Sequence, residues 1–397
     1  MGTLVLRRGL HPRLRAGHPW IYRGEIADVR GSWVPGDVVD VVDAAGSYVG
    51  RGTYNPRTSL ACRLFTRRQE PVDETFVARR LREALDYRRH AGVAAEAFRL
   101  CWSEADHLPG LVADSYGPVT VVQCFTLGMS KMLPWVREAL GDLLPGTWTY
   151  RRDDPTAARL EGFEARSEWM HDGDPGAPGA APEEILVEEN GSRFALRPGQ
   201  GHKTGLYLDQ RENRALVAAR AAGRRVLDGF CYTGAFACQA LRAGARDALL
   251  IDSSGEALAA ARRNLELNGF ADRAEVREAN VFDQLRQLDA RRERFGVVVL
   301  DPPPFTRRKD ALDAAARGYK EINIRGLRLL EPGGVLATFS CSHHVTQELF
   351  ESICRDAAGD AGVTARIVQT LGQGLDHPVL LNVPETRYLS GLLLQAA

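Results

Sequence analysis

The chain has 397 residues with 44% hydrophobic and 26% charged side chains, a composition that excludes disorder throughout and leaves material for more than one core. At roughly 150 residues per domain, this length suggests two or three domains. The 51 basic and 51 acidic residues balance, no apolar run reaches the roughly 20 residues of a membrane-spanning helix, and Arg7 and Arg8 interrupt the apolar N-terminus, so we expect a cytoplasmic protein without a membrane segment.

The first 70 residues have the pattern of short strands separated by Pro and Gly. We expect strands at 3–8, 37–43, 48–53 and 60–66, with a hairpin turn between the second and the third. This pattern favours a small β-barrel. The region carries eleven arginines against six acidic residues, a basic excess that is compatible with a nucleic-acid partner.

Residues 71–182 alternate between helical and strand patterns and predict an α+β domain followed by a linker. Helices are expected at 73–92 and 130–143, the second of which must accommodate Pro134. The expected strands are 98–102, 111–114, 119–125 and 147–151. The segment 171–182 is rich in Gly, Pro and Ala, which is typical of a linker.

From residue 183 a hairpin is followed by regular alternation of strand and helix. The Asn190-Gly191 pair predicts a tight turn between strands at 185–188 and 193–197. The strands expected next are 225–228, 248–252, 274–278, 297–301 and 335–340, and the helices are 236–243, 256–267, 281–291 and 312–330. This alternation predicts a parallel sheet covered on both faces, and three final strands are expected at 365–371, 379–382 and 388–395.

The seven cysteines are widely spread and form no CxxC pair. Their number and spacing argue against a disulfide framework and against a zinc site, so we expect no bound metal. Most of these thiols are expected to be small core residues. The cysteines are Cys62, Cys101, Cys124, Cys231, Cys238, Cys341 and Cys354.

Polar residues and glycines follow the ends of four predicted strands. Gly229 and Gly234 lie where the first strand turns into a helix, Asp252 ends the second strand, Asn280 follows the third, and Asp301 ends the fourth. Each alone is also explained as a helix cap or a turn glycine. Together they predict one ligand crevice, because open α/β sheets bind ligands at the carboxyl ends of their strands. The missing GxGxxG fingerprint disfavours a dinucleotide-dependent oxidoreductase.

The order of these motifs resembles that of class I S-adenosylmethionine-dependent methyltransferases. More narrowly, the chain resembles bacterial 23S ribosomal RNA cytosine-C5 methyltransferases with an N-terminal PUA domain. The segments that carry this likeness are His18-Pro19-Trp20-Ile21-Tyr22, Leu108-Pro109-Gly110-Leu111, Gly201-His202-Lys203-Thr204-Gly205, Leu208-Asp209-Gln210-Arg211, Phe339-Ser340-Cys341-Ser342, Asp376-His377-Pro378 and Pro384-Glu385-Thr386-Arg387-Tyr388. The resemblance implies a Rossmann-like domain with a mostly parallel seven-stranded sheet at 183–397, preceded by a PUA-like RNA-binding domain at 1–70 and a central α+β domain and linker at 71–182.

The resemblance also implies S-adenosylmethionine as the cofactor. The implied cofactor contacts are Gln210, Arg211, Asp228, Phe230, Tyr232, Thr233, Gly234, Asp252, Ser253, Asn280, Val281 and Asp301. The sequence departs from the family pattern at three positions, because Pro304 replaces a lysine, His202 replaces a glutamine, and Asn280 stands where an aspartate is common. An amide oxygen still accepts a hydrogen bond from an adenine amine, so the last change is compatible with binding.

Catalysis of this kind needs a nucleophilic thiolate, and Cys341 is the candidate. It follows the apolar strand at 335–340, so we expect it at the carboxyl edge of the sheet beside Asp301. Asp301 would hold the edge of the cytosine, and Phe305 would pack on the base. The competing cysteine, Cys231, lies within the cofactor loop and is expected to pack beneath the ligand. His343 and His344 titrate in a suitable range but fit surface residues at a helix entrance better.

The expected substrate is 23S ribosomal RNA, free or in the assembling large subunit, and a homodimer is left open. Arginines near Trp20, Tyr22 and Tyr54 would contact phosphates and stacked bases, although core packing explains Trp20 better. The arginines are Arg7, Arg8, Arg13, Arg15, Arg67 and Arg68, and the run Arg307-Arg308-Lys309 is a second candidate. Two rival functions remain, namely methylation of an amino group (adenine N6 or guanine N2) and a nonenzymatic RNA-binding assembly factor.

Overall fold

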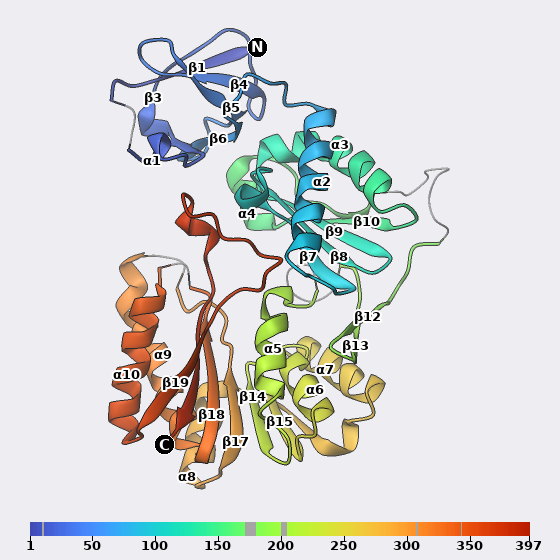
Figure 1. Cartoon of the computed structure of the whole chain (residues 1–397), viewed down its shortest axis with the longest axis vertical. Coiled ribbons are helices and arrows are strands. Elements are labelled where there is room, and N and C mark those ends of the chain that lie inside the picture. Colours follow the sequence, from blue (N-terminus) through green and yellow to red (C-terminus); the bar gives the residue numbers. More distant parts are fainter. Residues whose placement is uncertain (10–11, 171–179, 200–204, 307–308, 343) are drawn as a thin grey trace. The chain divides into compact units, whose positions relative to one another are not determined.

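The computed structural model describes residues 1–9, 12–170, 180–199, 205–306, 309–342 and 344–397, which divide into two compact units (Figure 1). Unit 1 comprises Met1–Ile185, Leu196–Gly205 and Leu375–Thr386, and unit 2 comprises Leu186–Ala195, Leu206–Gly374 and Arg387–Ala397. Most of the predicted linker, residues 201–204 of one family motif, Arg307, Arg308 and His343 lie outside the described residues.

Unit 1 begins with a six-stranded sheet of order β2-β6-β5-β4-β1-β3. Its elements are β1 (Gly2–Leu6), α1 (Pro12–Arg15), β2 (Trp20–Tyr22), β3 (Ile26–Arg30), β4 (Val38–Val42), β5 (Tyr48–Tyr54) and β6 (Leu60–Thr66). The predicted hairpin is confirmed, because β4 and β5 pair antiparallel. The Asp43 carboxylate closes the turn by accepting hydrogen bonds from the backbone N–H groups of Ala45 and Ser47, each at 2.8 Å.

The second part of unit 1 is a five-stranded sheet of order β11-β10-β9-β8-β7. Its elements are α2 (Glu74–His90), β7 (Ala97–Trp102), β8 (Leu111–Tyr116), β9 (Val119–Cys124), α3 (Leu127–Leu143), β10 (Trp148–Arg152), α4 (Pro155–Glu161) and β11 (Ser167–Trp169). Both predicted helices are confirmed, and Asp73 and Thr126 cap them by accepting from backbone N–H groups. The apolar faces of α2 and α3 share one buried cluster with β7, β8 and β9.

The segment Leu375–Thr386 belongs to unit 1, although it lies between two strands of unit 2 in the chain. The prediction of a strand at 379–382 was wrong, because these residues contribute only the isolated bridge between Leu380 and Val383. Buried polar groups hold the segment instead. Asp376 accepts a hydrogen bond from the backbone N–H of Arg99 at 2.9 Å, and its backbone carbonyl accepts one from Arg88 at 2.8 Å.

Unit 2 contains a seven-stranded sheet of order β16-β15-β14-β17-β18-β20-β19. The strands are β14 (Arg225–Gly229), β15 (Asp247–Asp252), β16 (Ala274–Glu278), β17 (Phe295–Leu300), β18 (Leu330–Ser340), β19 (Ala365–Leu371) and β20 (Ser390–Ala396). Every pairing between neighbours is parallel except those of β20, which runs antiparallel between β18 and β19. The predicted fold class is therefore confirmed.

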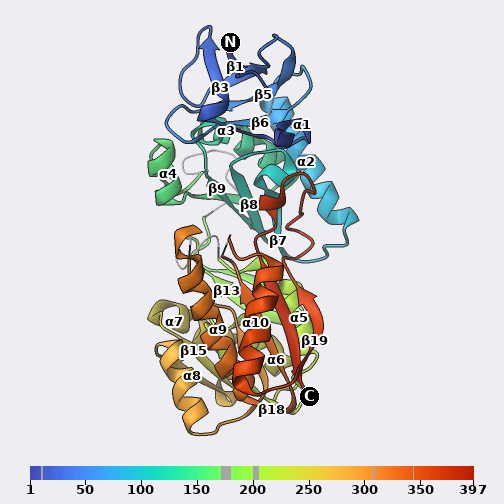
Figure 2. The ribbon, with the colours of Figure 1, turned by 90° about the vertical axis from the view of Figure 1, so that its left-hand side faces the viewer.

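Helices cover both faces of this sheet (Figures 1 and 2). They are α5 (Arg211–Ala218), α6 (Ala235–Arg242), α7 (Gly255–Leu267), α8 (Val281–Ala290), α9 (Leu312–Arg328) and α10 (Gln347–Ala361). Buried side chains of α8, α9 and α10 form one cluster with the sheet, which puts these three helices on the same face. The sequence analysis missed α5 and α10. The predicted hairpin is confirmed as β12 (Ile185–Glu189) and β13 (Ser192–Leu196), with positive φ at Asn190 and Gly191.

Candidate functional site

Strand register brings the predicted site residues of unit 2 to one edge of the sheet. Gly229 at the end of β14 pairs with Leu300 at the end of β17, and Leu300 pairs with Thr338 of β18. Asp301 follows Leu300 directly, and Cys341 follows the last residue of β18. Because these three strands are parallel, their carboxyl ends form one edge, as open α/β sheets require for ligand binding.

The loop after β14 has a strained backbone that is held by Asp252. Phe230, Tyr232 and Gly234 all have positive φ, at 62°, 50° and 73°. The two oxygens of Asp252 accept hydrogen bonds from the backbone N–H groups of Tyr232 and Ser254, each at 2.9 Å. A side chain at Gly234 would place its Cβ 2.8 Å from Leu250, so only glycine fits here.

Two buried polar groups in this loop region fit a polar, cationic ligand. Burial, together with the nearby carboxylates of Asp301 and Asp252, raises the pKa of Asp228 to about 7 against the opposing hydrogen bond from Ala237 N. The hydroxyl oxygen of Thr233 is buried without a hydrogen-bond partner in the described part of the chain. A hydroxyl-bearing ligand with a positive charge would satisfy both groups.

The other residues expected to contact a cofactor have different environments. Ser253 and Asn280 are exposed at the same edge, and the Asn280 side chain caps α8 by accepting from Asp283 N at 3.3 Å. Val281 is buried, and the Phe230 ring lies edge-on to Phe282 with centroids 6.1 Å apart. These groups can supply a polar rim and an apolar wall for a planar ring.

Gln210 connects the start of unit 2 with the loop after β17. It lies in a short 3₁₀ turn, η3 (Leu208–Gln210), and is 2% exposed. Its Nε2 donates to Asp301 Oδ2 at 3.0 Å, and its Oε1 accepts from Asn213 Nδ2 at 2.6 Å. Asn213 in turn donates to the carbonyl of Gly372 at 2.8 Å. This chain of hydrogen bonds fixes the orientation of the Asp301 carboxylate.

Residues that the sequence analysis did not select brace the same turn. The Tyr388 hydroxyl donates to Asp209 Oδ2 at 2.5 Å, which connects the last part of the chain to η3. The Tyr207 ring lies edge-on to Tyr232, with centroids 4.9 Å apart. Burial raises the pKa of Tyr207, and Tyr232 and Asp301 raise it further, so its hydroxyl stays protonated. One signal in the sequence could have identified them. Asp209 and Tyr388 lie within two of the family-like segments, 208–211 and 384–388, and Tyr207 directly precedes the first.

Cys341 differs from the other six cysteines in its exposure. All six are buried, whereas Cys341 is half-exposed. Burial raises the pKa of Cys62, Cys238 and Cys354 to about 12 and that of Cys231 far above its usual value, so these thiols stay protonated. Cys231 packs within the loop after β14, as the sequence suggested. The one thiol that reaches solvent is therefore the one at the carboxyl edge of the sheet.

The surroundings of Cys341 are fixed by its neighbours in the chain and by the loop after β17. Its Sγ lies 3.7 Å from the carbonyl oxygen of Pro302, the residue after Asp301. Ser342 is buried and its hydroxyl shares a hydrogen bond with the Tyr319 hydroxyl at 2.9 Å. The arrangement places a thiol and a carboxylate on adjacent loops, a combination suited to nucleophilic attack on a base held by the carboxylate.

Phe305 packs on aromatic neighbours and is partly buried. Its ring lies against Tyr319 of α9 with centroids 4.5 Å apart, and against Phe282 at 5.6 Å. Phe305 is thus part of an aromatic cluster beside the core. A Cβ added at Gly318 would lie 3.1 Å from the Phe305 ring, so the glycine makes room for this packing. Because the ring is only partly buried, its packing on a substrate base stays a prediction.

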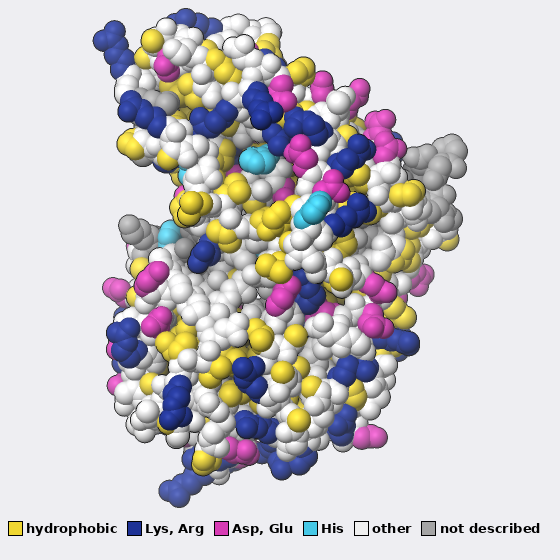
Figure 3. Space-filling model, viewed as in Figure 1, with side chains coloured by type: hydrophobic (Ala, Val, Ile, Leu, Met, Phe, Trp, Pro, Cys, Tyr) yellow, Lys and Arg dark blue, Asp and Glu magenta, His cyan; other side chains and the backbone are white. Residues whose placement is uncertain are grey.

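Most of the aromatic side chains of unit 1 that could contact RNA already pack against or bond to other residues of the protein. Trp20 donates to Glu104 at 2.8 Å and Tyr54 is buried, whereas Tyr22 is 39% exposed with Arg13 stacked over its ring. Arg13 also pairs with Glu25. Arg67 donates to two backbone carbonyls. The five candidate arginines other than Arg13 are all exposed, namely Arg7, Arg8, Arg15, Arg67 and Arg68. Basic and acidic side chains are interspersed on the face drawn in Figure 3.

Among the described residues, no group of three or more His, Cys, Asp and Glu side chains is arranged to bind a metal. A search of the same residues finds no helix with the length and apolarity to cross a membrane.

Two family models match the chain. A PUA-like domain matches residues 4–67, and an S-adenosylmethionine-dependent methyltransferase matches residues 101–367. The chain is also similar to proteins called ribosomal RNA large subunit methyltransferase I. It is 38% identical to that of Alteromonas mediterranea over 99% of this chain and 98% of the relative, and 39% identical to that of Pseudoalteromonas atlantica over 98% of each.

Solved structures with the same fold cover the whole chain. A protein of Streptococcus mutans assigned to the SAM-dependent methyltransferases superposes with a TM-score of 0.83 at 18% identity, covering 100% of both chains. A second methyltransferase structure, complexed with SAH, gives a TM-score of 0.84 at 19% identity with the same coverage. At these identities the likeness is one of fold.

Proposed function

Because the chain belongs to the S-adenosylmethionine-dependent methyltransferase family, we propose that it methylates C5 of a cytosine in 23S ribosomal RNA through a covalent bond to Cys341. The names of its relatives specify large-subunit ribosomal RNA, which supports this RNA as the substrate. Action on such a substrate implies a cytoplasmic enzyme. The observation that carries the proposal is the exposure of Cys341, the single half-exposed thiol among seven, beside Asp301.

The cysteine makes C5 reactive. C5 of cytosine is a poor nucleophile, and addition of the Cys341 thiolate to C6 converts the ring into an enamine whose C5 carries the electron pair. S-adenosylmethionine supplies an electrophilic methyl group to this carbon. Loss of the C5 proton then expels the thiolate, restores the aromatic ring and frees the enzyme. The bond from Cys341 to C6 is thus made and later broken, whereas the new methyl–C5 bond remains. S-adenosylhomocysteine leaves after the methyl transfer, and the C5 proton passes to a base. This sequence divides one difficult step into easier ones.

Asp301 holds the base during this addition. As the thiolate adds to C6, negative charge develops toward N3, and a proton at N3 or the exocyclic amine can donate to the carboxylate. Gln210 donates to one Asp301 oxygen at 3.0 Å, which holds the carboxylate in one orientation. Gln210 is therefore proposed as a positioning residue for Asp301 rather than as a direct cofactor contact.

The loop after β14 and its neighbours are proposed to hold the cofactor. The left-handed residues Phe230, Tyr232 and Gly234 open the backbone for close approach of the ligand. Asp252 and Ser253 lie at the end of β15, where hydroxyl groups of a ribose are bound in such folds. Asn280 and Val281 offer an amide and an apolar surface for the adenine, and Asp228 and Thr233 offer buried polar groups to the amino acid end.

Amino-group methylation is the second candidate, because Asp-Pro-Pro followed by an aromatic residue is typical of that chemistry. Here the aromatic residue is Phe305, which comes one position later than in that pattern and packs against Tyr319. An amino-group mechanism also needs no thiol. Loss of activity with Cys341→Ala therefore distinguishes the two chemistries, and cofactor binding distinguishes both from a nonenzymatic assembly factor.

The test compares Cys341→Ala with Cys354→Ala, a buried thiol in α10 far from Asp301 in sequence. We expect Cys341→Ala to lose methyl transfer while binding S-adenosylmethionine with unchanged affinity in calorimetry, and Cys354→Ala to retain both. Mass-spectrometric mapping of ribosomal RNA, made with and without the protein, identifies the modified nucleotide. Normal turnover by Cys341→Ala, or a methyl group on an exocyclic nitrogen, would refute the covalent mechanism.

A further inference from the structure

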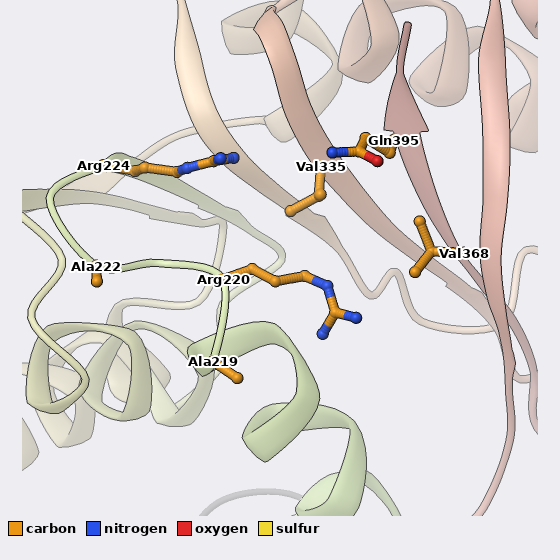
Figure 4. Close-up of a pocket in the computed structure, with 7 residues that line it drawn as sticks. All are labelled: Ala219, Arg220, Ala222, Arg224, Val335, Val368 and Gln395. Carbon is orange, nitrogen blue, oxygen red and sulfur yellow. The ribbon is translucent and has the colours of Figure 1, made fainter.

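We infer that unit 2 has a second ligand site, on the edge of the seven-stranded sheet opposite to Cys341, which binds a phosphate-bearing small molecule through Arg220 and Arg224. A pocket of about 460 Å³ opens here (Figure 4). Its lining residues are Ala219, Arg220, Ala222, Arg224, Val335, Val368 and Gln395. Pockets of roughly 300–1,000 Å³ accommodate small-molecule ligands, so a nucleotide-sized molecule fits this volume.

The place of the pocket in the sheet separates it from the methyl-transfer site. Arg224 comes immediately before β14, and Val335 is paired with Val297 near the start of β17 and with Gln395 near the end of the antiparallel β20. These are the amino ends of the parallel strands. Asp301 and Cys341 lie at the carboxyl ends, so the two sites occupy opposite edges of one sheet.

The two arginines of the pocket donate to backbone carbonyls. Arg220 donates to the carbonyl of Leu216 at 2.7 Å, and Arg224 donates to those of Gly296 and Gly333 at 3.3 and 3.1 Å. Neither forms an ion pair within the part of the chain that the structure describes. The next residue, Arg225, contrasts with them because it pairs with both Asp247 and Glu293. Two unneutralised guanidinium groups in one hollow attract an anion.

The Arg224 side chain is held in place by the strand beneath it. A Cβ at Gly296 would lie 2.7–2.8 Å from the Cβ, Cγ and Cδ atoms of Arg224, so the aliphatic stem lies directly on the backbone of β17. Both of its backbone acceptors are bonded through one nitrogen, Nη1. A guanidinium group carries five N–H donors in a rigid plane, and the donors not used for anchoring suit a phosphate, which takes two at a time.

Apolar side chains supply the opposite wall. Val368 lies at an irregularity of β19, between Ile367 paired with Leu394 and Gln369 paired with Leu393. Such bulges re-aim a side chain, and Val368 faces the pocket while 40% exposed. In Figure 4 the Arg220 side chain extends from its loop toward Val335 and Val368. The pocket thus has basic side chains on one side and apolar side chains on the other. A ligand with a phosphate at one end and an apolar ring at the other matches this arrangement.

The test uses the full-length protein saturated with S-adenosylhomocysteine, so that the site at the other edge is filled. Calorimetry compares adenosine 5′-monophosphate with adenosine and with inorganic phosphate. We expect the monophosphate to bind more tightly than either fragment, and Arg220→Gln to weaken it by about tenfold or more. The exposed Arg262→Gln, on α7, removes the same charge elsewhere and should leave the affinity unchanged.

A second variant tests the site without touching an arginine. Val368→Asp places a carboxylate at the exposed rim, where folding tolerates it, and should abolish binding by neutralising the guanidinium groups. A short oligoribonucleotide without terminal phosphates distinguishes the source of the phosphate, because tight binding that Arg220→Gln abolishes would assign the site to RNA phosphates. Lack of saturable binding by any probe below about 10 mM, or equal affinities in Arg220→Gln and Arg262→Gln, would overturn the inference.

Discussion

Replacement of Gln210 by glutamate exchanges the side-chain amide for a carboxylate at the centre of the proposed site. The side chain keeps its size and its burial, but the Nε2 that donates to Asp301 at 3.0 Å becomes an oxygen. The Asp301 carboxylate then faces a second carboxylate in place of a donor. Gln210→Glu therefore tests whether the orientation and charge of Asp301 matter, without removing any residue proposed to touch the substrate.

The magnitude follows from the distance. Two charges 3.0 Å apart repel by about 5 kcal/mol at an effective dielectric constant of about 20. Repulsion of this size makes the pair share one proton near neutral pH, as closely spaced carboxylates do. The wild-type contact is itself a charge-assisted hydrogen bond, which contributes ~1.5–3 kcal/mol. We expect a rate of methyl transfer lowered by ~10–100-fold near neutral pH, with partial recovery in more alkaline buffer as the shared proton is lost.

The assay is single-turnover methyl transfer to a ribosomal RNA fragment, measured from about pH 6 to pH 9. Gln210→Met serves as the uncharged comparison, since it removes the hydrogen bond and should slow the reaction without moving its pH profile. Gln287→Glu adds the same charge to an exposed position of α8 and should change neither rate nor profile. If Gln210→Glu keeps the wild-type rate and profile, the hydrogen bond to Asp301 has no part in the reaction.

Three further predictions concern the stability of unit 2 around the site and that of unit 1. Burial raises the pKa of Asp228 to about 7 from 3.8, so the folded chain holds a proton that the unfolded chain releases. The resulting stabilisation is complete below pH 3.8 and is lost as the pH rises through about 7. It amounts to ~4 kcal/mol at most, and urea unfolding at several pH values should show a smaller decline in Asp228→Asn. Gly234→Ala should lower the free energy of unfolding by about 1–3 kcal/mol and weaken S-adenosylmethionine binding in calorimetry, because its Cβ would meet Leu250; unchanged values of both would contradict this. Arg88 forms a buried ion pair with Asp106. Arg88→Met removes the cation of this pair and should cost unit 1 about 3–5 kcal/mol in chemical denaturation, whereas Arg88→Met combined with Asp106→Leu should recover most of the loss.

The local elements of the fold could be predicted because their causes are local. Apolar runs with short turns between them identified the strands of unit 2 that carry the ligand edge, and Asn190-Gly191 identified its hairpin. A 3.6-residue apolar period identified α2, and the helices α6 to α9 were expected as the stretches between successive strands. The helices α5 and α10 were missed; α5 buries two charged residues, Arg211 and Arg214, which gives it a weak apolar pattern.

The place of Cys341 at the carboxyl edge beside Asp301 could also be predicted, because parallel strands put their ends together. The polar Ser340-Cys341-Ser342 turn also favoured an accessible thiol, and most other cysteines were expected in the core. Packing buries all six of the others. The packing of Phe305 on Gly318 and Tyr319 of α9 could not be predicted, because no local pattern specifies the distance between these residues in space.

The sequence by itself determined which residues form strands, helices and turns, and the order in which the ligand-edge groups follow one another. Only the tertiary structure decided that 375–386 joins unit 1, that β20 enters the sheet between β18 and β19, and that Gln210 bonds to Asp301 across 91 positions. The physical reason is that secondary structure follows from side-chain periodicity over a few residues. Pairing of distant segments depends on the sum of buried area and satisfied hydrogen bonds over the whole chain.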